Sequence, residues 1–536
     1  MDMLRFDVVI VGAGIAGLVA ALDLLDRCAG IRIGIIDKGP VGSAGSTPLA
    51  QGGLAAAVGP DDSPALHALD TIRAGDGLCD PRAVMVTTHE GPARVADLVA
   101  RGARFDRTPL GALHLAREGA MSVPRSVHSA DATGAEIFRA LRDAASDRVT
   151  RLQGIACSLA LGPQPERRVA GVWALLDGLD ASAARLVLVT GRAVLLAAGG
   201  CGGLYGSTTN RDGATADGVA LAYAAGATLV DLEFVQFHPT GLRSDRRAGG
   251  QSEGSASRSR RLLITEALRG AGAVLVDQSG QRFMPSLHPD AELAPRHVVA
   301  KGILDQPNGA WIDATRLGDS RLAEEFPTAL RGARAHGYDL AREPVPVEPC
   351  EHYMIGGVAT DLQGRTTVPG LWAAGEVACT GIHGANRVAG NSLLQSCVFA
   401  HRAARSIVSL VSLLDGSQPP RVDPTPPPFA PRTGPVDLTA LRAELRAAMS
   451  AGAGPIRRAQ SLDATEHVMN AAAQALGPAP APTRDAVELA NLITVGRLIV
   501  RSARLRQESR GAHWRDDFPH PSPSWEGVRL RVQRTG

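Results

Sequence analysis

The sequence predicts an α/β protein with a Rossmann-like dinucleotide-binding domain, an inserted α+β domain that caps it, and a C-terminal helical domain. Three patterns indicate this fold. A glycine-rich turn follows a buried strand near the N-terminus, and two later strands run into glycines as if the same sheet resumed. A proline-rich stretch then precedes a region in which apolar residues repeat at helical spacing.

The first pattern begins with residues 8–11, a continuous apolar run typical of a strand buried on both faces of a parallel sheet. A GxGxxG motif at 12–17 and a helical pattern of leucines follow directly. A second apolar run, 31–36, ends at Asp37, about 20 residues after the glycines. This order of strand, glycine turn, helix and acidic residue predicts dinucleotide binding.

The glycines of this motif have separate expected roles. Gly12 allows the tight turn, Gly14 lets the backbone approach a pyrophosphate, and Gly17 lets the helix lie close to the strand. The free N–H groups and positive dipole end of the helix favour phosphate binding. We expect Asp37 to accept a hydrogen bond from a ribose hydroxyl. A turn that only packs a helix on a strand is the alternative interpretation.

The later patterns divide the chain into domains. Residues 192–202 and 369–381 each have the pattern of a buried strand that ends in glycines, so the stretch between them is expected to hold an insertion. A polar, arginine-containing run at 243–261 is predicted to be a solvated loop, with a lid as the alternative. The expected domains are the dinucleotide-binding domain in two parts, 1–231 and 351–418, the capping domain 232–350, a proline-rich linker 419–435 and the helical domain 436–536.

Composition narrows the class of protein. Apolar residues make up 45% and charged residues 21% of 536 residues, which is ordinary for a globular enzyme and excludes a wholly disordered chain. A net charge of +2 gives no field that would attract nucleic acid or anionic lipid. The uncharged run at 8–22 is too short for a membrane span, and the scattered cysteines fit a reducing compartment. We therefore expect a cytoplasmic protein with no nucleic-acid or membrane partner.

Several motifs after the nucleotide turn carry chemistry. They are GSTPLAQGG (45–53), REGAMSVPRSVHSADATG (117–134), FVQFHPT (234–240), LITEALRGAGA (263–273), APRHVVA (294–300), EHYMIGGV (351–358) and GIHGANRVAGNSLLQS (381–396). They supply His238, Thr265, Arg269, Arg296, His352, His383 and Arg387. If the fold brings these segments together, they form a pocket rich in cations and hydrogen-bond donors.

Each of these residues also has a purely structural interpretation. His238 lies in an apolar strand, where a hydrogen-bonded core histidine is common, and Arg269 and Arg296 are candidates for structural ion pairs. No metal site is predicted, because the histidines lack a ligand spacing such as HExxH and the acids are not clustered. A serine hydrolase is not predicted either, because no GxSxG motif follows a strand.

Taken in order, these motifs resemble the succinate dehydrogenase/fumarate reductase flavoprotein family, and within it the aspartate-oxidising branch. The resemblance covers nearly the whole chain, ending at RQESRGAHWRDDFP (506–519), which is similar to the family's C-terminal signature. It implies FAD as cofactor and a loop over the flavin at 45–53. The FAD-contacting residues that it implies are Gly12, Ala13, Gly14, Ile15, Ala16, Gly17, Asp37, Lys38, Gly45, Ser46, Thr47, Ala50, Gln51, Gly52, Gly53, Cys157, Asp217, Glu376, Ser392 and Leu393.

The resemblance also implies which residues take part in the reaction. His238, Thr265, His352 and Arg387 match the family's dicarboxylate ligands. Arg296 matches its catalytic arginine, which exchanges a proton at the substrate carbon. The expected activity is the FAD-dependent oxidation of L-aspartate to iminoaspartate, the first step of de novo NAD biosynthesis through quinolinate.

Two positions favour the aspartate-oxidising branch. Ser46 stands where the dehydrogenases carry a histidine that bonds covalently to FAD, so the FAD is expected to be non-covalent. Glu118 matches the acid that aspartate-oxidising members place near the substrate's amino group. A shielded carboxylate favours an ammonium and disfavours a bare methylene. The chain departs from the family pattern at Met121, in place of a histidine, and at Gln395, in place of a glutamate.

The expected partners are small molecules. The substrate is L-aspartate or a related C4-dicarboxylate, O2 or fumarate reoxidises the flavin, and quinolinate synthase is the expected recipient of the product. The first alternative is a soluble fumarate reductase or succinate dehydrogenase flavoprotein, against which Ser46 and Glu118 argue. The second is a non-catalytic flavin-binding subunit that carries electrons, against which the retained Arg296 and Arg387 argue.

Overall fold

The computed structural model describes residues 2–39, 45–163, 167–178, 184–243, 260–413, 421–429 and 436–534. Most of the predicted loop at 243–261, and the two ends of the predicted linker at 419–435, lie outside the described residues. Within the described ranges, none of the helices is long and apolar enough to cross a membrane.

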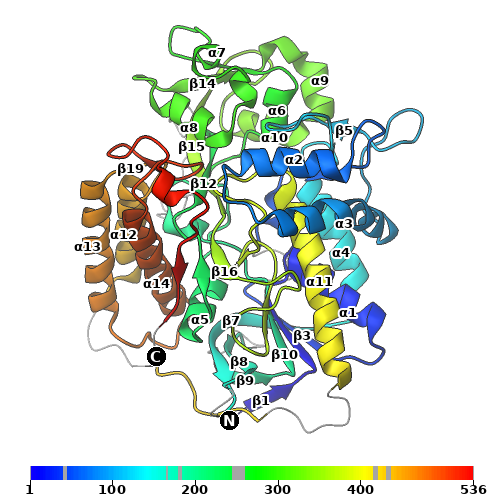
Figure 1. Ribbon diagram of the computed structural model, residues 1–536, viewed down its shortest axis with the longest axis vertical. Helices are drawn as coiled ribbons and strands as arrows, with labels where there is room; N and C mark the ends of the chain where they lie inside the picture. Colours follow the sequence, from blue (N-terminus) through cyan, green and yellow to red (C-terminus); the bar gives the residue numbers. More distant parts are fainter. Residues whose placement is uncertain are drawn as a thin grey trace.

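An eight-stranded sheet forms the lower part of the molecule in Figure 1. Its strands follow the order β1-β9-β8-β7-β3-β2-β10-β17 and confirm the predicted α/β fold. The run from β7 to β17 is parallel, whereas β8 is antiparallel to both of its neighbours. The bounds are β1 (Asp2–Arg5), β2 (Val8–Val11), β3 (Ile33–Asp37), β7 (Thr150–Leu161), β8 (Val169–Leu176), β9 (Arg185–Thr190), β10 (Ala193–Leu196) and β17 (Leu371–Ala373).

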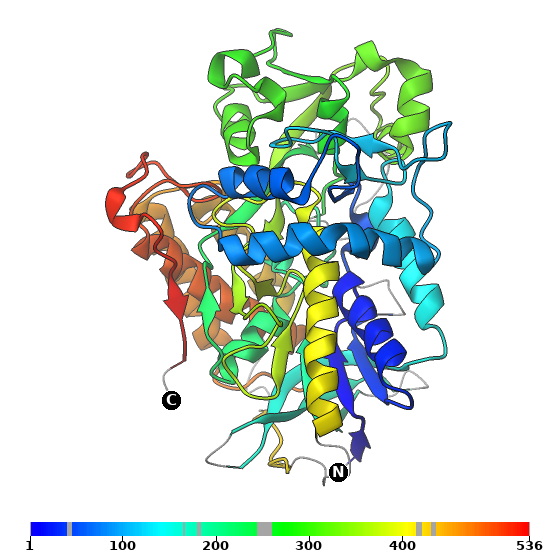
Figure 2. The same cartoon turned by 45° about the vertical axis from the view of Figure 1, so that its right-hand side comes forward.

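Strand β2 divides its side chains between two apolar cores. Val8 and Ile10 face one core with α1 and α11, which lie side by side in Figures 1 and 2. Val9 and Val11 face the other core, to which α5 and α14 contribute. Burial on both faces explains the uninterrupted apolar run in the sequence. These helices are α1 (Ile15–Arg27), α5 (Asp217–Ala224), α11 (Asn391–Leu413) and α14 (Arg484–Leu505).

A second, antiparallel sheet of order β12-β15-β14-β13 and several short helices form the upper part of the molecule in Figure 1. The bounds are β12 (Val235–Leu242), β13 (Val274–Val276), β14 (Ala310–Asp313), β15 (Val345–Met354), α6 (Glu266–Gly270), α7 (Met284–Leu287), α8 (Arg296–Leu304), α9 (Gly318–Glu325) and α10 (Pro327–Ala335). This part has its own apolar core. The predicted boundary between 350 and 351 falls inside β15, because the pairing of β15 with β12 continues as far as Met354.

The C-terminal region is helical, as predicted, and its helices α12 (Leu438–Gly452) and α13 (Ala459–Leu476) pack with α14. After α14 the chain returns to the centre, where β21 (Arg531–Val532) pairs with β11 (Leu229–Val230). This sheet continues through β16 (Gly357–Ala359) to β18 (Ala378–Cys379). The remaining α-helices and strands are α2 (Pro64–Ala74), α3 (Pro81–Ala100), α4 (Thr133–Ala145), β4 (Leu54–Ala55), β5 (Leu115–Ala116), β6 (Ser126–Val127), β19 (Ile456–Arg457) and β20 (Trp514–Arg515).

Candidate active site

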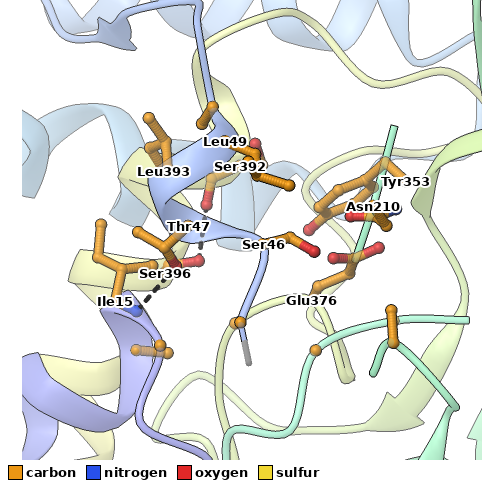
Figure 3. Close-up of a pocket in the computed structure, with 18 of the residues that line it drawn as sticks. Ile15, Ser46, Thr47, Leu49, Asn210, Tyr353, Glu376, Ser392, Leu393 and Ser396 are labelled. Atoms are coloured by element: carbon orange, nitrogen blue, oxygen red, sulfur yellow. Dashed lines mark hydrogen bonds between the residues drawn. The ribbon is translucent and has the colours of Figure 1, made fainter. Parts of the chain in front are cut away.

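A cavity extends from the glycine turn after β2 to the upper sheet. Its lining comes from the turn itself, the 45–53 loop, β7, β12, α6, α8, β15 and the start of α11. Figure 3 shows Ser46 from one end of the chain, and Tyr353 and Glu376 from a region about 300 residues later, around the same space. The fold therefore brings motifs that are hundreds of residues apart into one site.

The glycine turn has the geometry that a pyrophosphate needs. Gly12 has a φ of +107°, and a Cβ there would lie 2.3 Å from the Ala197 carbonyl oxygen. Helix α1 begins after Gly14, which has no side chain to cap the helix. The Ile15 N–H donates to Thr47 Oγ1 at 3.1 Å, so the 45–53 loop lies against the positive end of α1 (Figure 3). These residues fit the phosphate part of FAD.

Lys38 and Asp217 form an ion pair at the border of this cavity. Lys38 Nζ lies 2.6 Å from Asp217 Oδ2 and 2.9 Å from Glu488 Oε1 of α14. Asn491 of the same helix donates to Asp217 Oδ1 at 2.8 Å. Helix α14 therefore holds two of the predicted cofactor residues in place, and the sequence contains no signal for this long-range contact.

Glu376 is a partly buried carboxyl group that lines the cavity. It accepts a hydrogen bond from the Met354 N–H at 2.9 Å. Burial and the nearby Glu351 raise the pKa of Glu376 to about 8. At neutral pH this group is therefore largely protonated and can donate a hydrogen bond to an oxygen in the cavity.

All but two of the predicted FAD-contacting residues line the cavity. The exceptions are Gly17, at which a Cβ would lie 2.0 Å from the Gly12 carbonyl oxygen, and Cys157. On β7 it is Gly154 and Ala156 that line the cavity beside Cys157. Gly17 therefore acts through the close packing of α1, and the roles of the other residues toward FAD stay a prediction.

Two arginines meet at the opposite end of the cavity. Arg296 Nη1 and Arg387 Nη1 each donate to the same oxygen, Gln236 Oε1, at 3.1 Å. Arg387 also donates to Ser392 Oγ at 2.5 Å, and its guanidinium lies 4.7 Å from the centre of the Tyr353 ring. Burial and the charge of Arg296 lower the pKa of Arg387 to about 10. Both side chains are buried, so this end of the cavity strongly favours an anion.

Glu266 balances part of this positive charge. Arg296 Nε donates to Glu266 Oε2 at 2.6 Å, and the Gly119 N–H donates to Glu266 Oε1 at 2.7 Å. Burial opposes ionisation, but the charges of Arg296 and Arg269 lower the pKa of Glu266 to about 2. Glu266 is therefore ionised at neutral pH and orients the Arg296 guanidinium.

Two histidines on neighbouring strands add hydrogen-bond donors to this end of the cavity. The Thr240 N–H donates to His238 Nδ1 at 3.2 Å, so the proton of the neutral His238 ring is on Nε2. His352 Nδ1 lies 2.7 Å from Thr209 Oγ1, and the two imidazole rings are 5.1 Å apart. Burial and the charge of Arg296 hold both histidine pKa values well below the usual range. Neutral imidazoles thus face the cavity.

Glu118 and Thr265 come from two further segments that line the same cavity. Glu118 Oε1 accepts hydrogen bonds from Ser126 Oγ at 2.5 Å and from the Gly53 N–H at 3.3 Å. Burial and the charge of Glu266 raise the pKa of Glu118 above its ordinary value. Thr265 is the N-cap of α6, because its Oγ1 accepts from the Ala267 N–H at 3.4 Å.

The six residues predicted to take part in the reaction therefore line one cavity, whereas Arg269 and His383 lie behind its wall. Gln236 and Glu266 were not among the predicted site residues. Both lie inside motifs named above, but only the fold shows that their side chains contact Arg296. In the described part of the chain, no group of three or more His, Cys, Asp or Glu side chains could hold a metal ion.

Comparison with known families agrees with this architecture. Residues 7–393 match the model of the FAD binding domain, and residues 442–531 match the model of the fumarate reductase flavoprotein C-terminus. Escherichia coli quinol fumarate reductase FrdA, solved as a variant, has a TM-score of 0.86 and 27% identity, over 100% of this chain and 96% of that chain. Mycobacterium smegmatis Sdh1 has a TM-score of 0.82 and 30% identity, over 100% and 93%. The fold and the cavity define an FAD-dependent flavoprotein.

Curated relatives narrow this class. L-aspartate oxidase of Streptomyces coelicolor is 44% identical, over 99% of this chain and 92% of its own length. L-aspartate oxidase of Caulobacter vibrioides is 41% identical, over 98% and 96%. The chain belongs to the L-aspartate oxidase family.

Proposed function

We propose that this protein oxidises L-aspartate to iminoaspartate with FAD as the electron acceptor, as the first step of de novo NAD biosynthesis through quinolinate. The observation that carries the proposal is that one cavity is lined by both positive and negative side chains. The Arg296 and Arg387 side chains meet on Gln236, and Glu118 lines the same cavity. L-Aspartate carries the complementary charges, with two carboxylates for the cations and one ammonium for Glu118.

The donors divide naturally into two groups, one for each carboxylate. We assign Arg387 and His352 to one carboxylate, and His238 with Thr265 to the other. Neutral histidines suit this task because each offers an N–H donor without adding a charge. Binding at both ends of a four-carbon diacid orients the reacting C–H, and such positioning can contribute up to ~7–11 kcal/mol.

The glycine turn, the loop at 45–53 and the start of α11 would hold FAD, and the bound flavin would accept the hydride that leaves the aspartate Cα. Ser46 offers no imidazole nitrogen, so a histidyl–flavin bond cannot form at this position. Glu376 is largely protonated at neutral pH and suits a polar oxygen of the cofactor.

Arg296 is assigned as the essential cation at the reacting carbon. Its guanidinium is hydrogen-bonded to the ionised Glu266, which keeps it oriented. A free guanidinium has a pKa above 12 and is a poor base, so a proton leaves the substrate through a relay rather than on Arg296 alone. The balanced reaction removes one hydride from Cα and one proton from the ammonium, which gives the protonated imine of iminoaspartate.

The wider context of the reaction is proposed from the family. O2 or fumarate reoxidises the reduced flavin, the product passes to quinolinate synthase, and the protein works in the cytoplasm.

An anaerobic titration tests the function. L-Aspartate is expected to bleach the yellow flavin of the purified protein, and succinate is expected to leave it oxidised. Bleaching by succinate but not by L-aspartate would instead identify a succinate dehydrogenase. In the same preparation, acid precipitation is expected to release the yellow colour into the supernatant, because the FAD is not covalently bound.

A further inference from the structure

The two carboxylate oxygens of Glu118 have different surroundings. Oε1 accepts both hydrogen bonds of this side chain, from Ser126 Oγ at 2.5 Å and from the Gly53 N–H at 3.3 Å. Among the described residues, none donates a hydrogen bond to Oε2. A Cβ on Gly52, in the loop over the flavin site, would lie 3.1 Å from this oxygen. One oxygen is thus held by the protein, and the other is left for a ligand.

Ser126 is held rigidly enough to determine where Oε1 lies. It belongs to β6, the central strand of a three-stranded sheet, and pairs with Ala55 of β4 and Ala116 of β5. Its side chain is fully buried. A Cβ on Gly53 would lie 2.2 Å from Ser126 Oγ, so a glycine at 53 is needed for this close approach.

The segment that holds Ser126 is itself anchored to the loop before α2 and to α2. Arg125 Nε lies 3.1 Å from Asp62 Oδ2, and Arg125 Nη2 lies 2.9 Å from Asp70 Oδ2. Ser122 Oγ donates to the same Asp70 carboxylate at 2.8 Å. The segment that carries the Ser126–Glu118 contact is therefore held by ion pairs and hydrogen bonds, so the geometry of the contact does not depend on a bound substrate.

We propose that Ser126 is a positioning residue that makes the site selective for an amino diacid, because its hydroxyl holds one oxygen of Glu118 and leaves the other, as a carboxylate, for the substrate ammonium. The inference rests on the proposed function and deepens it. It concerns the choice between a dicarboxylate with an amino group and one without.

The charges around Glu118 explain why a neutral hydroxyl matters here. Glu266 of α6 faces Glu118 and disfavours its ionisation, whereas Arg296 of α8 favours it, and Arg269 lies behind Glu266. Burial opposes the charged form as well, and the Ser126 and Gly53 hydrogen bonds favour it. Without the Ser126 hydroxyl, Glu118 holds its proton to a higher pH. A protonated Glu118 pairs poorly with an ammonium but tolerates a methylene.

The test compares Ser126→Ala with the wild-type holoenzyme. We expect the acid limb of the kcat/KM profile for L-aspartate to move up by about one pH unit, which is a tenfold loss on that limb. The Ki of succinate, a competitor without an amino group, is expected to stay within twofold or to fall. The Kd of FAD is expected to stay unchanged. Cysteine has a similar volume and a weak S–H donor, so the acid limb of Ser126→Cys should lie between those of the wild type and Ser126→Ala.

Ser122→Ala is the matched control, because it removes a hydroxyl from the same segment that contacts Asp70 and not Glu118. It is expected to keep the wild-type pH profile. Three results would overturn the role of Ser126: an unshifted acid limb in Ser126→Ala, an equal loss for L-aspartate and succinate, or the same shift in Ser122→Ala. A wild-type protein whose flavin L-aspartate does not reduce would instead overturn the proposed function itself.

Discussion

Replacing Arg387 with alanine separates its role toward the substrate from a role in folding. Its guanidinium is buried, donates to Gln236 and Ser392, and stacks on Tyr353. No carboxylate of the described residues lies within ion-pair distance of it. A buried cation without an ionic partner costs free energy in the folded protein, as its pKa of about 10 indicates. Its charge is therefore available to a ligand.

The expected effect of Arg387→Ala falls on ligand binding. Loss of one partner of a buried charge pair costs roughly 2–5 kcal/mol. This corresponds to a KM for L-aspartate that rises by about 30- to 4,000-fold. The thermal midpoint of the apoprotein should not fall, because the variant removes an unpaired buried charge. Arg387→Lys should recover only part of the affinity, because an ammonium cannot bind a carboxylate through two parallel N–H groups.

The measurements are steady-state kinetics with L-aspartate, a succinate titration followed by the flavin spectrum, and thermal unfolding of the apoprotein. An unchanged KM would remove Arg387 from the substrate site. A large fall in the thermal midpoint, with affinity for succinate retained, would make it a structural residue.

Three further changes are expected to have distinct results. Arg296→Leu should abolish turnover with FAD still bound, and a near-normal kcat would refute its role at the reacting carbon. The apoprotein carrying Glu376→Gln should gain stability relative to wild type as pH rises from about 5 to 8, because the folded wild type keeps a proton that the unfolded chain releases near its ordinary pKa. Equal thermal midpoint differences at pH 5 and 8 would contradict this. Lys38→Met leaves Asp217 and Glu488 without their shared cation, so the Kd of FAD, measured by flavin fluorescence, should rise at least tenfold while kcat at saturating FAD stays near wild type. An unchanged Kd would show that this ion pair does not support the cofactor site.

The sequence by itself determined the nucleotide-binding half of the fold, the FAD cofactor and the family. The nucleotide-binding half depends on local patterns, since a buried strand, the turn at Gly12 and the helix after it form from neighbouring residues. FAD as the particular cofactor was implied by the family resemblance. Several motifs in the same order then indicated the family, even though each motif alone is weak. The roles predicted for the site residues, including Arg296 and Arg387, remain predictions.

Only the tertiary structure decided which side chains contact one another inside the cavity. Gln236 bridges two arginines, Ser126 holds Glu118, and Lys38 reaches a helix near the other end of the chain. The Gln236 and Lys38 contacts join segments that meet only when separate sheets and helices assemble. The Ser126–Glu118 contact is only eight residues apart and depends on how the chain turns between β5 and β6. The pKa values of the site residues could not be predicted from the sequence either, because they depend on burial and on neighbouring charges that only the folded chain supplies.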